Sequence, residues 1–250
     1  MNYLSERNKI EEVCLLAGKI MLQSGAETYR VEDTMIRIAS FFGSDDPQSY
    51  VTPTGIIFSL HGTEKTKLLR ITKRTTNLNK VIIVNNISRK ISSGEISVEE
   101  AYTLLRKIEV EDPKYSSYVT TTAASIASGF SIIMLNGEWN DFLSSFIAGG
   151  AGFSCQLYLH RLVNLKFFSE FIASLVVGLL SFLFIEVGMG HDLSNIIVSS
   201  VMPLVPGLLI TNAVRDIMAG HLVSGLSKGA EASFTAFAIS SGIAIIFSLF

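Results

Sequence analysis

The sequence predicts an α-helical integral membrane protein with about five transmembrane helices and an N-terminal cytoplasmic α+β domain. Hydrophobic residues make up 48% of the 250 residues. Charge is unevenly distributed, since residues 1–117 hold 16 of the 20 Lys and Arg residues and 15 of the 22 Asp and Glu residues. The rest of the chain contains five apolar segments of about 18–22 residues, each long enough to cross a hydrocarbon layer of ~30 Å as a helix.

The change in composition near Pro113 predicts two domains, residues 1–115 in the cytoplasm and residues 116–250 in the membrane. Residues 1–9 are polar and lack the apolar core of a secretory signal, so we expect the first domain to stay in the cytoplasm. The net charge of -2 provides no strong field for nucleic acid, and we expect no nucleic-acid partner.

Hydrophobic periodicity predicts a small α+β fold for the first domain. Apolar residues at spacings of three and four predict helices, and β-branched or aromatic runs bounded by Pro, Gly or Thr-Glu predict strands. The expected order is a helix over residues 5–23, a second helix closed by Gly43, strands Ser49–Pro53, Gly55–His61 and Lys67–Lys73, a helix closed by Gly94, and a last helix from a capping box at Ser97–Glu100 to about Ile108.

Polar residues at two turns of this domain could carry chemistry. The run Ser24–Thr28 stands at a helix start, where free backbone N–H groups can bind an anion. The alternative is an ordinary cap in which Ser24 or Glu27 satisfies those donors. A nucleophile in the turn Thr52–Gly55 would need His61 as its base. Because no nucleotide-binding, nucleophile-elbow or metalloprotease motif occurs, we expect no enzyme, no catalytic residue, no metal site and no cofactor.

Loop charges predict the orientation of the membrane segments. If the first domain is cytoplasmic, all four basic residues of the second domain fall in inner loops, as the positive-inside rule requires. Five crossings then place the C-terminus outside the cell membrane. The basic residues are Arg161, Lys166, Arg215 and Lys228, and the segments are Tyr118–Leu135, Asn140–Leu159, Phe168–Val187, Leu193–Thr211 and Gly229–Phe250.

Small residues line these segments, at four-residue steps in two of them and as a continuous run in a third. In lipid, such stripes let helix backbones approach closely. Packing explains them, and the alternative is a solute path lined with small polar groups. The stripes are Thr121, Ser125 and Gly129, then residues 148–152, and finally Ala236, Ser240, Ala244 and Ser248.

The fourth segment contains two prolines and a glycine, which predict a kinked or broken helix with free backbone polar groups. Transporters place binding sites at such breaks. An arginine at the cytoplasmic edge could hold a substrate carboxylate, and the alternative is a proline kink with a surface pair that sets topology. The candidate pathway residues are Pro203, Pro206, Gly207, Asn212, Arg215 and Asp216, and a proton-coupling role is open for Glu170, Glu186 or Glu231.

Three separated stretches form recognisable motifs: residues 23–34 (QSGAETYRVEDT), residues 50–56 (YVTPTGI), and residues 203–207 with 211–216 (PLVPG and TNAVRD). Together they resemble the threonine/serine exporter family, and specifically its large, YjjP-type subunit. The resemblance implies export of small carboxylates, threonine and serine in fused members and dicarboxylates such as succinate in some split ones, coupled to an ion gradient and most simply to protons. Fused members carry a second membrane half, so the resemblance also implies a separate small membrane subunit.

We therefore predict a multi-pass subunit of a secondary exporter, an antiporter, that moves small carboxylate solutes out of the cell together with a small partner subunit. A homo-oligomer of the chain is the further assembly to be considered. Two alternatives remain, a membrane-anchored hydrolase with its site around Thr52, Thr54 and His61, and a regulatory scaffold of a partner transporter. In the cytoplasmic domain, the residues expected to serve transport are Glu27, Arg30, Glu32, Asp33, Thr52 and Thr54.

Overall fold

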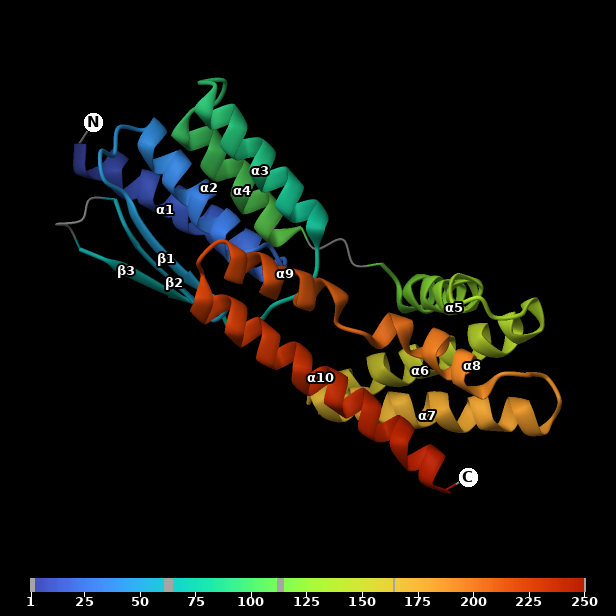
Figure 1. Ribbon diagram of the computed structural model, residues 1–250. Helices are drawn as coiled ribbons and strands as arrows, with labels where there is room; N and C mark the ends of the chain where they lie inside the picture. The colour runs from blue at the N-terminus through green and yellow to red at the C-terminus, as the bar shows by residue number, and fades with distance from the viewer. Residues whose placement is uncertain (1–2, 61–64, 112–114, 164, 250) are drawn as a thin grey trace. The chain divides into compact units, whose positions relative to one another are not determined.

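The structure, a computed structural model, describes residues 3–60, 65–111, 115–163 and 165–249 and is mostly helical (Figure 1). The chain forms two compact units. The first comprises Met1–Pro113 with Leu208–Gly229, and the second comprises Lys114–Gly207 with Ala230–Phe250. Leu208–Gly229 thus groups with the N-terminal part of the chain, whereas the domain boundaries predicted from composition assign it to the membrane domain.

The first unit layers a three-stranded sheet, one pair of helices and a second pair of helices. The sheet is an antiparallel meander in the order β1-β2-β3, with Val51 opposite Ile56 and Ile56 opposite Leu69. Helices α1 and α2 pack against the sheet, and α3 and α4 pack against that pair (Figure 1). The elements are α1 (Tyr3–Gln23), α2 (Thr28–Phe41), β1 (Gln48–Thr52), β2 (Gly55–Ser59), β3 (Lys67–Arg70), α3 (Leu78–Ser92) and α4 (Val98–Val110).

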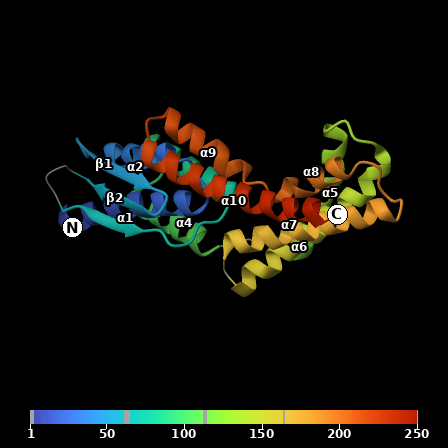
Figure 2. The same cartoon turned by 60° about the horizontal axis from the view of Figure 1, so that its bottom comes forward.

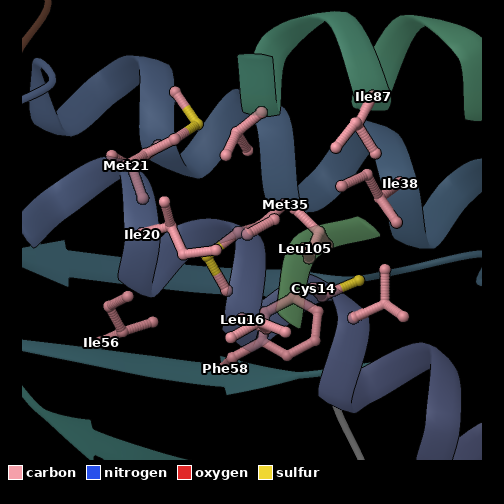
Figure 3. Close-up of a cluster of buried hydrophobic side chains, with 14 of the residues drawn as sticks. Cys14, Leu16, Ile20, Met21, Met35, Ile38, Ile56, Phe58, Ile87 and Leu105 are labelled. Atoms are coloured by element: carbon pink, nitrogen blue, oxygen red, sulfur yellow. The ribbon is translucent and has the colours of Figure 1, made fainter. Parts of the chain in front are cut away.

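The core of the first unit lies between the sheet and the helices. Along β2, Ile56 and Phe58 are buried and Ile57 between them is exposed, the alternation expected of a sheet covered on one face. Met35 of α2 and Leu105 of α4 belong to the same core cluster as these strand residues (Figure 3). Burying each such side chain contributes about 1.5–3 kcal/mol, so the first unit can hold a stable core of its own.

The local signals in the sequence are confirmed with small shifts at the boundaries. Ser97 Oγ accepts from the backbone N–H of Glu100 at 3.3 Å and Glu100 Oε2 accepts from the backbone N–H of Ser97 at 2.9 Å, which is the predicted capping box. The third strand ends at Arg70 and not at Lys73. His61, predicted at the end of the second strand, lies outside the described residues.

In the second unit, α6 is the central helix, in contact with α5, α7 and α8. Figures 1 and 2 both show α6 beside α7. A Cβ atom at Gly149 would overlap Ser128 Oγ and lie 3.1 Å from Ser200 O, so α5 and α8 approach α6 only because this residue has no side chain. The elements are α5 (Ser117–Met134), η1 (Trp139–Asp141), α6 (Phe142–Val163), α7 (Lys166–Glu186), α8 (Leu193–Val201), η2 (Met202–Leu204) and the later part of α10 (Leu222–Leu249).

The packing explanation of the small residues therefore holds for residues 148–152 and for Ser125, which is buried against Gly150. The stripe on α10 differs. Its four members are exposed, so contacts inside the described chain do not account for them; they are Ala236, Ser240, Ala244 and Ser248.

Three helices are long and apolar enough to cross a membrane: Trp139–Val163, Lys166–Glu186 and Leu222–Leu249. A bent pair, Leu193–Leu204 with Gly207–Met218, would be a fourth span if counted as one. The sequence predicts five. Helix α5 forms where expected, but it is rich in Ser and Thr and is not among the spans found in the described residues.

The predicted break in the fourth segment is confirmed. Helix α8 ends at Val201, a short 3-10 turn carries Pro203, and Val205 is extended with φ -65° and ψ 131° before α9 (Gly207–Met218) begins. A residue that precedes proline avoids the helical region, so Pro206 explains the extended conformation of Val205. The last helix was predicted to begin at Gly229, and it begins seven residues earlier, at Leu222.

Candidate functional site

Helix α9 and the first turns of α10 form a hairpin within the first unit (Figure 1). The chain turns at Gly220, whose φ of +87° is readily adopted only by glycine. The two helices come close at Gly225, where a Cβ atom would clash with Ile217 and lie 2.9 Å from Ala213 O. This close approach brings Asp216 of α9 and Lys228 of α10 to the same face of the hairpin.

Asp216 caps the N-terminus of α2. Its Oδ1 accepts from the backbone N–H of Thr28 at 2.9 Å, and its Oδ2 accepts from Thr28 Oγ1 at 2.9 Å. Glu27, the residue at the cap position, makes no side-chain cap of its own. The helix start is therefore capped by a carboxylate of the same chain and not by Glu27.

Lys228 completes a buried ion pair with Asp216. Its Nζ lies 2.7 Å from Asp216 Oδ2 and 3.0 Å from Thr28 Oγ1, and the exposed fractions of the two charged side chains are 5% and 0%. Charges buried this deeply need both a counter-ion and hydrogen bonds. The contacts of Asp216 and Lys228 with Thr28 therefore hold the hairpin against the start of α2.

Glu27 lies between two arginines. Arg215 Nη1 is 2.6 Å from Glu27 Oε1, and Arg30 Nη1 is 3.2 Å from Glu27 Oε2. The Glu27 side chain is 7% exposed, whereas those of Arg215 and Arg30 are 61% and 39% exposed. Burial raises the pKa of Glu27, but its own backbone N–H and the two guanidinium groups outweigh that effect and hold the pKa below its ordinary value of 4.5.

Glu32 and Ser224 satisfy the free edge of β1. Glu32 Oε1 accepts from the backbone N–H of Val51 at 2.7 Å, and Ser224 Oγ donates to Val51 O at 3.1 Å. His221 Nδ1 lies 3.6 Å from Glu32 Oε1. Burial raises the pKa of Glu32 above its ordinary value, with a contribution from the negative charge of Asp216, although the Val51 N–H and His221 act in the opposite direction.

The structure thus brings together predicted residues from two separate sequence motifs. Asn212 joins them, because its Nδ2 donates to Gly25 O at 2.9 Å in the α1–α2 loop. We name this group of side chains the hairpin cluster. Its members are Glu27, Thr28, Arg30, Glu32, Asn212, Arg215, Asp216, His221, Ser224 and Lys228.

Three predicted residues of the N-terminal domain lie outside the hairpin cluster. Asp33 pairs with Arg37 on the surface of α2. Thr52 Oγ1 donates to Gly55 O at 3.3 Å within its own turn, and Thr54 is exposed. With its expected base at position 61 outside the described residues, the hydrolase hypothesis gains no support from these contacts. Pro203, Pro206 and Gly207 belong to the second unit.

Lys228 is the main member that the sequence does not reveal. It was interpreted as a loop residue that sets topology, and it lies inside α10, buried against Asp216. Thr28 was predicted only as part of a helix start. In the sequence, the ion pair is visible only as a lysine twelve positions after an aspartate. That spacing indicates a contact only when the chain is known to turn back at Gly220.

The chain resembles known proteins along almost its whole length. A family model described as "Putative threonine/serine exporter" matches residues 12–250. The chain belongs to this family. The threonine/serine exporter family match covers both structural units, so both the hairpin cluster and the apolar helices are parts of one exporter-type, multi-pass membrane protein. No solved structure matches the chain.

Individual relatives of the threonine/serine exporter family differ in length. The chain is 22% identical to the "Probable threonine/serine exporter" of Mycobacterium tuberculosis, over 95% of this chain and 45% of that protein. It is 24% identical to the "Threonine/serine exporter" of Corynebacterium glutamicum, over 97% and 52%. It is 23% identical to the "Probable succinate transporter subunit YjjP" of Escherichia coli, over 98% and 96%. The chain therefore spans about half the length of the two exporters and nearly all of the subunit.

Proposed function

We propose that this chain is a subunit of a secondary exporter that moves small carboxylate solutes, of the threonine, serine or succinate kind, out of the cell in exchange for protons, and that it is not an enzyme. The family match supports the transport class. The names of the relatives support the solute class, because all of them refer to small carboxylic acids.

One observation supports a site for the carboxylate: Glu27 is held by two arginines, of which Arg215 is largely and Arg30 partly exposed. A guanidinium group has five N–H donors, and each of these arginines uses part of that set on Glu27. The carboxylate of a solute is the same chemical group as the side chain of Glu27. Arg215 and Arg30 can therefore bind a solute carboxylate with their remaining donors, or exchange Glu27 for it.

The proposal includes an orientation and a partner. The first unit faces the cytoplasm, because the positive-inside rule favours that arrangement. The proposal counts α5 and the bent pair as crossings besides the three apolar helices, and these five crossings place the C-terminus outside. The partner is a small membrane subunit that provides further helices, as the word "subunit" in the name of the Escherichia coli relative suggests. The exposed small residues of α10 suit such a contact, since small side chains let helices pack closely in lipid.

Solute flux tests the proposal. Vesicles that contain the full chain, with and without a candidate small subunit, are loaded with labelled serine, threonine or succinate and with the matching amides, which lack the carboxylate. We expect efflux of one or more of the carboxylates and none of the amides. Absence of efflux under both conditions, or equal efflux of amides and acids, would contradict the proposal.

A further inference from the structure

A second polar group lies in the second unit, where α7 meets α10. Lys166 Nζ pairs with Glu231 Oε1 at 2.9 Å, and the rings of Phe167 and Phe234 lie 5.7 Å apart beside them. Further along, a Cβ atom at Gly242 would lie 2.7 Å from the backbone carbonyl of Phe171. The two helices are therefore in close contact over several turns.

One turn behind this ion pair lie two buried polar side chains. Glu170 follows Lys166 by four residues and is 2% exposed, and Thr235 follows Glu231 by four residues and is fully buried. The Thr235 hydroxyl lies beside the Glu170 carboxyl group. Within the described residues, neither Glu170 Oε2 nor Thr235 Oγ1 has a hydrogen-bond partner.

The charge on Glu170 would be poorly compensated in this arrangement. The nearest cation, Lys166, is paired with Glu231, so its charge is already neutralised. Ionisation would place negative charge on Oε2, which is buried without a hydrogen-bond partner, at a cost of several kcal/mol, and lipid on the outside of the helices offers no water to reduce that cost. A neutral carboxylic acid avoids most of this penalty. The packing therefore suits a Glu170 that carries a proton.

Other ionisable groups stand on the helices that pack against α7. The charges that act on Glu170 are those of Lys166 on its own helix and Glu231 on α10. Helices α6 and α8 also pack against α7. Asp141 precedes α6 and Asp192 precedes α8, whereas α6 itself carries Cys155 and Tyr158, and then His160 and Arg161 in its last turn, a few residues before α7 begins.

We propose that Glu170 is a proton-binding site of the membrane unit, protonated while Lys166 pairs with Glu231 and deprotonated when Lys166 pairs with Glu170 instead. Residues four apart lie on the same face of a helix, so Lys166 can reach either carboxylate by a change of side-chain rotamer. On release, the O–H bond of Glu170 breaks, the proton passes to water, and the carboxylate takes Lys166 as its counter-ion. Glu231 is then left ionised at the partly exposed end of the contact.

The use of this proton in transport rests on the proposed exporter function, but proton binding itself does not. Infrared difference spectra of the purified full chain in lipid, taken between high and low pH, report protonated carboxyl groups by their C=O stretch. The matched variants are Glu170→Gln and Glu186→Gln, since Glu186 is an exposed carboxylate at the other end of the same helix.

We expect a pH-dependent C=O component, resolved by subtracting the spectra of each variant from those of the wild type, that is lost in Glu170→Gln and retained in Glu186→Gln. A band that persists unchanged in Glu170→Gln would overturn the proposal. If Glu170→Gln does not fold, as judged by gel filtration, Thr235→Val replaces it: removal of the neighbouring hydroxyl should shift the frequency of the band, and an unshifted band would count against Glu170.

Flux measurements then separate the two proposals. In vesicles, a pH gradient should accelerate solute efflux by the wild type and by Glu186→Gln, while efflux by Glu170→Gln should proceed at the rate seen without a gradient. Retained acceleration in Glu170→Gln would overturn the role in coupling. A wild type that shows the band but moves no solute would contradict the proposed function and leave the proton site standing.

Discussion

Three donors converge on Asp216: the backbone N–H and the hydroxyl of Thr28 and the ammonium group of Lys228. A buried pair of this kind adds little net stability compared with apolar residues of the same size, but the loss of one partner is costly because the other charge remains buried. The two residues should therefore be more sensitive to single substitution than to joint replacement.

Lys228→Met is expected to lower the free energy of unfolding of the detergent-solubilised chain by about 3–5 kcal/mol, because Asp216 would stay buried without a counter-ion. The matched control is Arg37→Met, which breaks the exposed pair with Asp33 and should cost less than ~1 kcal/mol. Adding Asp216→Asn to Lys228→Met should restore part of the loss. Equal effects of the two single variants would rule out a buried charge as the cause.

The lowered pKa of Glu27 predicts that the stability of the folded chain depends on pH. The pKa of this carboxyl group is lower in the folded chain than its ordinary value of 4.5. Its contribution is therefore fully present above that value, where folded and unfolded chains both carry the ionised group. It is lost as the pH falls through the folded-state pKa, because the unfolded chain takes up the proton first.

The measurement compares the thermal unfolding of the wild type with that of Glu27→Gln across this range. The advantage of the wild type should be constant above pH 4.5 and should shrink as the pH falls below it. An advantage that does not change with pH, or one that grows on acidification, would show that the two arginines do not favour the ionised form of Glu27.

Sequence reasoning identified most of the charged residues of the hairpin cluster but not their arrangement. Arg215 and Asp216 were predicted for a solute pathway and Glu27 for a motif in the other domain, and the structure shows that they are neighbours. Their proximity depends on the packing of α9 against the start of α2, which brings together residues almost 190 apart in the chain. No local pattern encodes such a contact.

At the scale of elements, glycine in α6 sets the spacing between helices. A side chain at Gly149 would overlap Ser128 of α5 and approach the backbone of Ser200 in α8. Gly149→Val should therefore destabilise the chain by about 1–3 kcal/mol or more, measured as a lower unfolding midpoint in detergent. Gly229→Ala is the control, because the nearest atom to its new Cβ would be Ala213 Cβ at 4.0 Å. Equal midpoints for the two variants would contradict the close packing.

The elements themselves were largely predictable, and the exceptions have physical causes. The capping box at Ser97 and the break near Pro206 depend on local chemistry, and both occur as expected. The start of α10 was placed too late, because Lys228 was counted as a loop residue and a paired lysine can lie inside a helix. The length of α5 suits a membrane span, but the helix is rich in Ser and Thr and is not among the spans found in the described residues.

At the scale of the whole molecule, the division of the chain into units differs from the change in composition. Charge falls sharply near residue 117, yet Leu208–Gly229 groups with the N-terminal part. Composition records which residues are polar, whereas the grouping depends on the contacts of a few of them, chiefly Asp216, Arg215 and Lys228. The α9–α10 hairpin is therefore part of the first unit, although the sequence on either side of it is apolar.

The most direct test of the account is the efflux of labelled serine, threonine and succinate from vesicles that contain Arg215→Ala, with Arg37→Ala as a control on the surface of α2. A hydrogen bond to a charged group is worth about 1.5–3 kcal/mol, so we predict that Arg215→Ala lowers flux by roughly tenfold or more while the chain still inserts into the membrane. Arg37→Ala should transport like the wild type. Wild-type flux in Arg215→Ala would contradict the assignment of the carboxylate site and would favour a regulatory role for the hairpin cluster.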